Sequence, residues 1–188
     1  MKATGLATIE EIITNDANSW QPTRGENTDL LRKFLLTQGN LDSDAFESVN
    51  AEAADILRKC EDLTTIDAPS KTILCVGKVQ SGKTLSFTNL VALAADNGVK
   101  LIICLAGSKK ILSDQNYTRL KRDLQTDEDE SSIRIIHQKE HLSEVSSINS
   151  IVSGGSRYNS KKTVLLTILK HHKRIKTLRE MVENNKLL

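Results

Sequence analysis

Residues 71–107 read KTILCVGKVQSGKTLSFTNLVALAADNGVKLIICLAG, and this stretch decides the fold. It contains two short apolar runs, residues 72–76 and residues 101–106. Runs that are apolar on both faces are typical of buried parallel strands. Between them, apolar residues recur with a helical period over residues 85–96, and Gly98 supplies a signal that ends a helix. The stretch therefore predicts a strand, a loop, a helix and a second strand in that order.

The loop of this unit, residues 77–84, reads GKVQSGKT and matches the pattern G-x-x-x-x-G-K-T of a phosphate-binding loop, or Walker A motif. Gly77 permits a tight turn after the strand, and Gly82 lets the backbone approach a phosphate closely. A chance match in a chain of this length has a probability on the order of one per cent. The motif therefore predicts a nucleoside triphosphate site.

The chemistry of such a loop assigns roles to its residues. Backbone N–H groups and the start of the following helix hold the phosphates of ATP. Lys83 is expected to bridge the β- and γ-phosphates, and the Thr84 hydroxyl is expected to coordinate Mg²⁺, which makes these two the candidate catalytic residues. The expected ATP-binding residues are Gly77, Lys78, Val79, Gln80, Ser81, Gly82, Lys83, Thr84 and Leu85. A related loop that binds nucleotide without hydrolysing it fits the same pattern.

The rest of the chain predicts an α/β domain over residues 71–188, preceded by a helical extension over residues 1–70. Further strands are expected at residues 99–106, 132–137 and 163–169, each followed by a helical pattern. This order predicts a parallel sheet flanked by helices, with right-handed crossovers.

Three helices are expected in the extension, at residues 9–13, 28–35 and 43–60, with Thr28 capping the second. The extension is expected to pack on the α/β domain. Trp20, in the loop before the second helix, is expected either to pack or to stack on a base.

Composition is that of an ordinary globular protein, with 38% hydrophobic and 27% charged residues and a formal charge of +2. The charge is uneven, since residues 157–188 hold nine Lys or Arg and two Glu. The three cysteines do not have the spacing of a metal site, and Cys75 and Cys104 fall in predicted buried strands. This pattern favours reduced thiols and a cytoplasmic location. No apolar run approaches ~20 residues, so no membrane span is expected.

Residues 76–84, 88–90, 94–98 and 101–107 together resemble the first RecA-like domain of superfamily 2 (DEAD/DEAH-type) helicase-like ATPases. More narrowly, they are similar to bacterial proteins in which such a domain accompanies a Z1 domain and endonuclease-type modules. The resemblance implies a P-loop NTPase fold with ATP and Mg²⁺ as ligands. It also implies a nucleic-acid partner, expected to be DNA, and a role in DNA restriction or anti-phage defence.

Two segments are candidate nucleic-acid contacts, the first because of the same resemblance and the second because of its own residues. Residues 108–115 resemble the family's motif after the second strand, which implicates Ser108, Lys109 and Gln115; an ordinary helix start is the alternative. Lys170 and His171 lie at a basic strand-to-helix turn, which is either a phosphate contact or solvated surface.

One feature departs from the family. A working ATPase needs an acidic motif after a hydrophobic strand, and no predicted strand here ends in a carboxylate. The chain is therefore expected to be an N-terminal fragment or an early-ending product, with a second RecA-like or nuclease domain supplied in cis or in trans. A nucleotide-binding fragment without hydrolysis is the first alternative function, and a small-molecule kinase is the second. His137 and His141 lack a third ligand for a metal.

Overall fold

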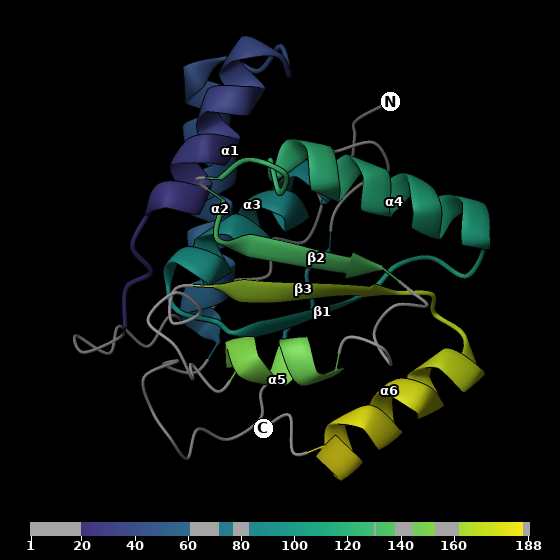
Figure 1. Ribbon diagram of the computed structural model, residues 1–188. Helices are drawn as coiled ribbons and strands as arrows, with labels where there is room; N and C mark the ends of the chain where they lie inside the picture. Colours follow the sequence, from purple (N-terminus) through teal and green to yellow (C-terminus); the bar gives the residue numbers. More distant parts are fainter. Residues whose placement is uncertain are drawn as a thin grey trace, which may run out of the picture.

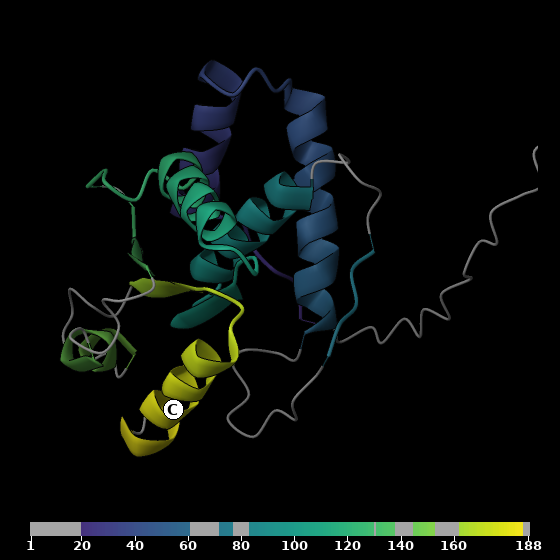
Figure 2. The same cartoon turned by 90° about the vertical axis from the view of Figure 1, so that its right-hand side faces the viewer.

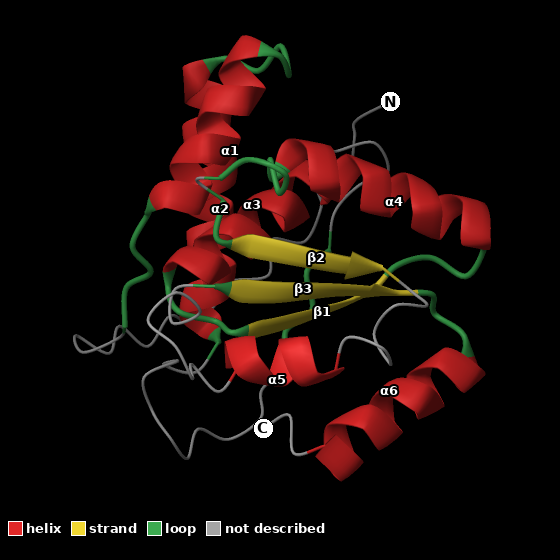
Figure 3. Cartoon of the chain, viewed as in Figure 1, coloured by secondary structure: helices red, strands yellow, loops and turns green. Residues whose placement is uncertain are grey.

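The computed structural model describes residues 20–60, 72–76, 83–129, 131–137, 145–152 and 162–185. Within these residues, three parallel strands form a sheet in the order β1-β3-β2. The strands are Leu101–Leu105 (β1), Ile133–His137 (β2) and Thr163–Ile168 (β3). The chain is thus an α/β protein whose parallel sheet is flanked by helices, as the hydrophobic patterns predicted (Figure 3).

Helices cover both faces of the sheet (Figure 1). Among the described residues they are Glu26–Thr37 (α1), Ser43–Lys59 (α2), Lys83–Asp96 (α3), Lys110–Asp123 (α4), Val145–Val152 (α5) and His172–Asn185 (α6). One face packs against α3 and α4, with α1 and α2 outside them, while α5 and α6 lie on the other face (Figures 1 and 2). The helix predicted at residues 9–13 lies outside the described residues.

The central strand β3 separates two apolar cores. Leu165 packs with α1, α3 and α4 residues, whereas Val164, Leu166 and Ile168 pack with α5 and α6. All six residues of β3 are buried, because the strand has a neighbour on each side and helices on each face. This is the continuous apolar pattern of a central parallel strand.

The connections between the strands share one hand. From β1 the chain crosses β3 to β2 by way of α4, and it returns to β3 by way of α5 on the opposite face. The second connection runs across the sheet in the opposite direction and over the opposite face, so both connections have the same hand. That hand is right-handed, as it is in nearly all connections between parallel strands (Figure 2).

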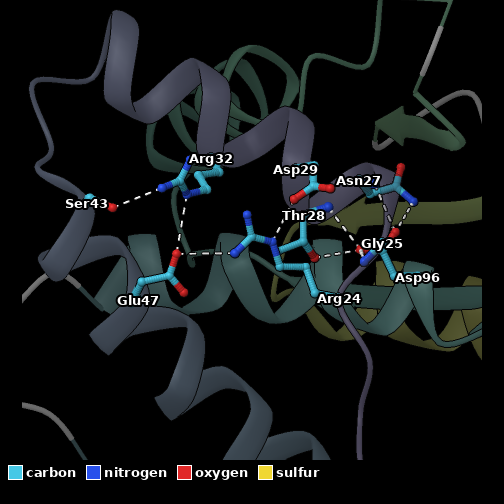
Figure 4. A network of polar contacts seen from close by, with 9 residues as sticks. All are labelled: Arg24, Gly25, Asn27, Thr28, Asp29, Arg32, Ser43, Glu47 and Asp96. Atoms are coloured by element: carbon cyan, nitrogen blue, oxygen red, sulfur yellow. Dashed lines mark hydrogen bonds and ion pairs between the residues drawn. The ribbon is translucent and has the colours of Figure 1, made fainter.

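The two N-terminal helices pack against α3, and a carboxylate at the end of α3 ties them down (Figure 4). The Asp96 carboxylate accepts hydrogen bonds from the backbone N–H groups of Gly25, Asn27 and Thr28 at 2.9–3.0 Å. It also accepts from the Asn27 amide at 2.8 Å and from the Thr28 hydroxyl at 2.6 Å. Asp96 therefore caps α1 from a distant part of the chain.

This arrangement corrects one prediction about α1. The helix begins three residues earlier than expected, with Gly25 in place of Thr28 as its N-cap, and the cap has no side-chain hydrogen bond of its own. Thr28 lies inside the first turn and is buried, so it does not cap the helix in the usual local way. The sequence pattern alone suggested a local cap because Thr is a common one.

The prediction of a strand at residues 72–76 is wrong for this structure. The segment is irregular, and Leu74 and Val76 are 85% and 88% exposed. Cys75 is exposed as well, which corrects its placement in a buried strand, whereas Cys104 in β1 is half-buried. A strand needs a neighbouring edge to pair with, and among the described residues this segment has none.

The end of α3 is as predicted. Gly98 has φ of +88°, in the left-handed region that glycine tolerates, and its N–H donates to the carbonyl of Ala95. The turn delivers the chain to the start of β1. No helix in the described part of the chain combines the length and apolar character needed to cross a membrane.

Candidate phosphate-binding edge of the sheet

The helix that should follow the phosphate-binding loop begins where the motif requires. Helix α3 starts at Lys83, and no acidic residue lies in its first turn. Thr84 is half-buried, and its carbonyl oxygen accepts a hydrogen bond of 2.8 Å from the buried hydroxyl of Thr88. Residues 77–82 and the side chain of Lys83 lie outside the described part of the chain. A helix start free of carboxylates suits a phosphate, since its N–H groups carry partial positive charge.

The body of α3 is fixed in the core. Val91, Ala92 and Ala95 pack against the sheet side, and Leu93 and Ala94 pack against α2. Because α3 runs toward the start of β1, its N-terminus points toward the carboxyl edge of the parallel strands (Figure 1). Ligands of open α/β sheets bind at this edge.

At the same edge the structure brings together two of the predicted nucleic-acid segments. The N–H of Lys170 donates to the carbonyl of Gly107 at 2.9 Å, and the N–H of Ala106 donates to the carbonyl of Ile168 at 2.8 Å. These bonds hold the turn before α4 beside the turn before α6. Ser108 and Lys109 on one turn therefore neighbour Lys170 and His171 on the other, and all four are exposed.

The helix starts at these two turns also suit an anion. The N-cap of α4 is Lys109, which makes no side-chain hydrogen bond, and neither α4 nor α6 has an acidic residue in its first turn. The rings of His171 and His172 lie 4.3 Å apart at the start of α6. Cationic side chains beside uncapped N–H groups are the features that bind phosphate.

Gln115, the remaining predicted contact, lies further along α4. It is exposed and lines an open hollow of ≈ 640 Å³ on the outer side of that helix, with Ile111, Asp114, Thr118, Arg119 and Arg122. Gln115 is thus separated from the two turns by more than one helical turn. No contact in the described residues joins it to Lys170 or His171.

A polar cluster that sequence patterns missed lies at the carboxyl end of β2. His137 Nδ1 is 2.7 Å from the Thr167 hydroxyl, and His137 Nε2 is 3.0 Å from Asp114 Oδ1. The ring of Tyr117 stacks on the imidazole at 4.4 Å. The four members, Asp114, Tyr117, His137 and Thr167, are 3 to 53 residues apart in sequence, and no spacing rule could have linked them.

The geometry of this cluster makes His137 a structural support. Both ring nitrogens are engaged, and Thr167 is fully buried, so its hydroxyl is not open to a substrate. The cluster connects α4 to the ends of β2 and β3. Within the described ranges, no three His, Cys, Asp or Glu side chains are grouped to hold a metal ion. His141, the suggested metal partner of His137, lies outside those ranges.

The carboxylate that an ATPase needs does not follow any of the three strands. The residues directly after β1, β2 and β3 are Ala106, Gln138 and Leu169, and none of them is acidic. Asp114 approaches a strand end, but only through its contact with His137. The residues present therefore fit phosphate and, through the Thr84 hydroxyl, one ligand of Mg²⁺.

Comparison with known proteins adds no relative, since no family model, curated protein or solved structure matches this chain.

Proposed function

We propose that this chain is the ATP-binding module of a helicase-like, nucleic-acid-dependent ATPase. The observation that carries the proposal is the sequence of residues 77–84 joined to a helix that begins at Lys83. A glycine-rich loop opening directly into a helix is the arrangement that holds the phosphates of nucleoside triphosphates.

In this proposal the P-loop residues divide the work of binding. The backbone of residues 77–85 surrounds the phosphates, Lys83 neutralises their charge, and the Thr84 hydroxyl is a ligand of Mg²⁺. When bound, Mg²⁺ supplies charge neutralisation at the phosphates. The firm seating of α3 in the core supports the proposal, because a phosphate site gains from a helix that does not shift.

Nucleic acid is the proposed partner at the paired turns before α4 and α6. Four exposed residues there, Ser108, Lys109, Lys170 and His171, present hydroxyl, cationic and imidazole groups to solvent. Such groups contact the nucleic-acid backbone without reading its sequence. The choice of DNA, and of a role in restriction or anti-phage defence, comes from the resemblance of residues 76–107. The RecA-like, P-loop NTPase identity of the fold is part of the same proposal.

A second candidate is ATP binding without hydrolysis by this chain alone. The absence of a carboxylate directly after β1, β2 or β3 favours it. In that case the acidic group, and any arginine that contacts the γ-phosphate, come from a further RecA-like or nuclease domain.

Titration calorimetry with ATP and Mg²⁺ tests the main proposal. Wild-type chain and the matched surface variant Lys33→Ala should bind equally, because Lys33 is exposed on α1. Lys83→Ala should weaken binding by at least roughly tenfold, as expected for loss of a charge-assisted phosphate contact. No binding by the wild-type chain would refute the proposal. ATP turnover with and without DNA then separates the two candidates.

A further inference from the structure

The outer edge of β2 is an unpaired strand edge. Within the described residues β2 pairs with β3 alone and stands at one end of the sheet order β1-β3-β2. The N–H of Thr163 in β3 donates to the carbonyl of Ser132, just before β2. Because successive residues of a strand direct their backbone groups to opposite sides, every second residue of β2 turns its N–H and C=O away from β3. These residues are Ile133, Ile135 and His137.

The outward backbone groups are open to another chain. Neither the N–H nor the C=O of Ile135 forms a hydrogen bond with a described residue, and the same holds for the N–H of His137. The N–H of Ile133 reaches only the Ser131 hydroxyl, at 3.4 Å. Proline and bulges often protect an edge strand, but β2 holds no proline and its register with β3 has no bulge. The edge is therefore a template for strand addition.

This edge lies in a groove of ≈ 350 Å³. One wall includes Tyr117 and Lys121 of α4, and the other wall is the turn that leads into β2, residues 126–129 and 131–132. In Figure 2 this turn projects beside β2 at the outer side of the sheet. The ring of Tyr117 is held by stacking on His137, with the ring centroids 4.4 Å apart. An extended chain that pairs with β2 therefore has a bounded site.

The charge at one end of the groove indicates the chemistry of its occupant. Three exposed carboxylates lie in the turn at the amino end of β2, on Asp127, Glu128 and Asp129. Asp127 pairs with Lys121 at 3.0 Å, whereas Glu128 and Asp129 have no ion pair with a described residue. Further along the groove lies Arg134, a cation. The occupant should therefore carry basic side chains at the acidic turn and uncharged ones along the strand.

We propose that the outer edge of β2 binds an extended peptide, which adds to the sheet as an antiparallel strand and carries basic residues at its carboxyl end. In antiparallel pairing one peptide residue exchanges both of its backbone bonds with Ile135. The residues that follow in the peptide pass Ile133 and reach Glu128 and Asp129. Main-chain bonds supply affinity, and the acidic turn sets the direction. This partner is a polypeptide, and its binding does not depend on ATP or nucleic acid.

Fluorescence anisotropy with a labelled peptide tests the backbone pairing. The probe is Thr-Val-Thr-Val-Thr-Lys-Lys with both ends blocked, and its dissociation constant should be on the order of 0.1 mM. N-methylation of the third residue removes the N–H that faces Ile135 and should weaken binding by roughly tenfold. N-methylation of the fourth residue is the matched control, because that N–H points away from β2. It should leave the affinity unchanged.

Variants of the acidic turn test the direction of binding. Glu128→Lys combined with Asp129→Lys should weaken binding of the probe by at least roughly fivefold, and added salt should reduce the difference. Asp44→Lys combined with Glu180→Lys makes the same change of charge at exposed sites on α2 and α6, and it should bind as the wild-type chain does. The reversed peptide, Lys-Lys-Thr-Val-Thr-Val-Thr, should bind more weakly than the probe.

Each result decides a separate point. If the wild-type chain does not bind the probe up to ~1 mM, or if both N-methylated peptides lose affinity equally, strand addition at this edge is overturned. Tighter binding of the reversed peptide overturns the antiparallel direction. Equal losses in the two double variants overturn the role of the acidic turn. Sedimentation of the free chain as a dimer that the probe dissociates shows that a second copy occupies the edge, and it overturns a separate peptide partner.

Discussion

The carboxylate of Asp96 is the contact whose loss should destabilise this fold most clearly. Its Oδ1 accepts from the backbone and side chain of Asn27, and its Oδ2 accepts from Gly25 and from the backbone and hydroxyl of Thr28. Asn27 and Thr28 are 6% and 0% exposed, so water does not replace the lost acceptor. The Asn27 amide in turn bonds to the Ser132 hydroxyl at the start of β2. One side chain thus connects α1, α3 and the sheet.

The magnitude follows from counting the donors left without an acceptor. In Asp96→Ala the N–H groups of Asn27 and Thr28 and the Thr28 hydroxyl lose their acceptor in a buried site. At ~1–2 kcal/mol for each buried unsatisfied donor, the expected loss is about 4 kcal/mol. In Asp96→Asn one oxygen remains, and whichever way the amide sits at least two donors lose their partner. The expected loss is then about 2 kcal/mol.

Urea unfolding followed by circular dichroism measures both losses. The midpoint should fall while the slope stays constant, since the surface exposed on unfolding is nearly unchanged. Asp29→Asn is the matched control, because Asp29 forms an exposed ion pair with Arg24 at 2.6 Å. Exposed pairs contribute only about 0–1 kcal/mol. If Asp96→Asn cost no more than Asp29→Asn, the distant cap would not be stabilising, and the account of how α1 is held would be refuted.

Three further predictions concern single sites. Gly98→Ala should cost about 1 kcal/mol in urea unfolding, because φ is +88° while no atom lies within 4 Å of the added carbon; an unchanged midpoint would contradict backbone strain as the cause. Thr167→Val should cost about 1–2 kcal/mol by leaving His137 Nδ1 without its buried partner, whereas Thr118→Val on the exposed face of α4 should cost less than about 0.5 kcal/mol. Burial raises the pKa of the Cys104 thiol, so less thiolate is present at a given pH. The rate at which iodoacetamide modifies Cys104 should therefore still rise above pH 9.0. A rate that reaches its plateau below that pH would contradict the direction of the shift.

The elements between Lys83 and Leu105 are those that sequence patterns predicted best. Their signals are local: a helical period, the left-handed Gly98 and a short apolar run each act through neighbours in sequence. The helical pattern predicted after residues 163–169 is helix α6, for the same reason. The candidate site was predictable only as far as it is local, namely the start of α3 and the two basic turns.

Long-range partners were beyond the reach of these patterns. Asp96 caps a helix whose first turn lies 68–71 residues away, and Asp114 meets His137 across 23 residues. Nothing in the spacing of such residues records that the fold will bring them together. The strand prediction at residues 72–76 was wrong for a related reason. An apolar run has the propensity for a strand, but it becomes one only when an edge is available and the register is satisfied.

Helix α3 is the element on which the functional argument depends, because its two ends serve different purposes. At its C-terminus, Asp96 and Asn97 fix the N-terminal helices through eight hydrogen bonds to residues 23–28, with Asn97 both donating to and accepting from Thr23. At its N-terminus, Lys83 and Thr84 belong to the proposed ATP loop. A helix held at one end by charged and amide groups cannot easily tilt to meet a ligand at the other. Movement on binding is therefore expected in the segment before the loop, residues 72–76, where Leu74 and Val76 are exposed, and the body of α3 should stay in place.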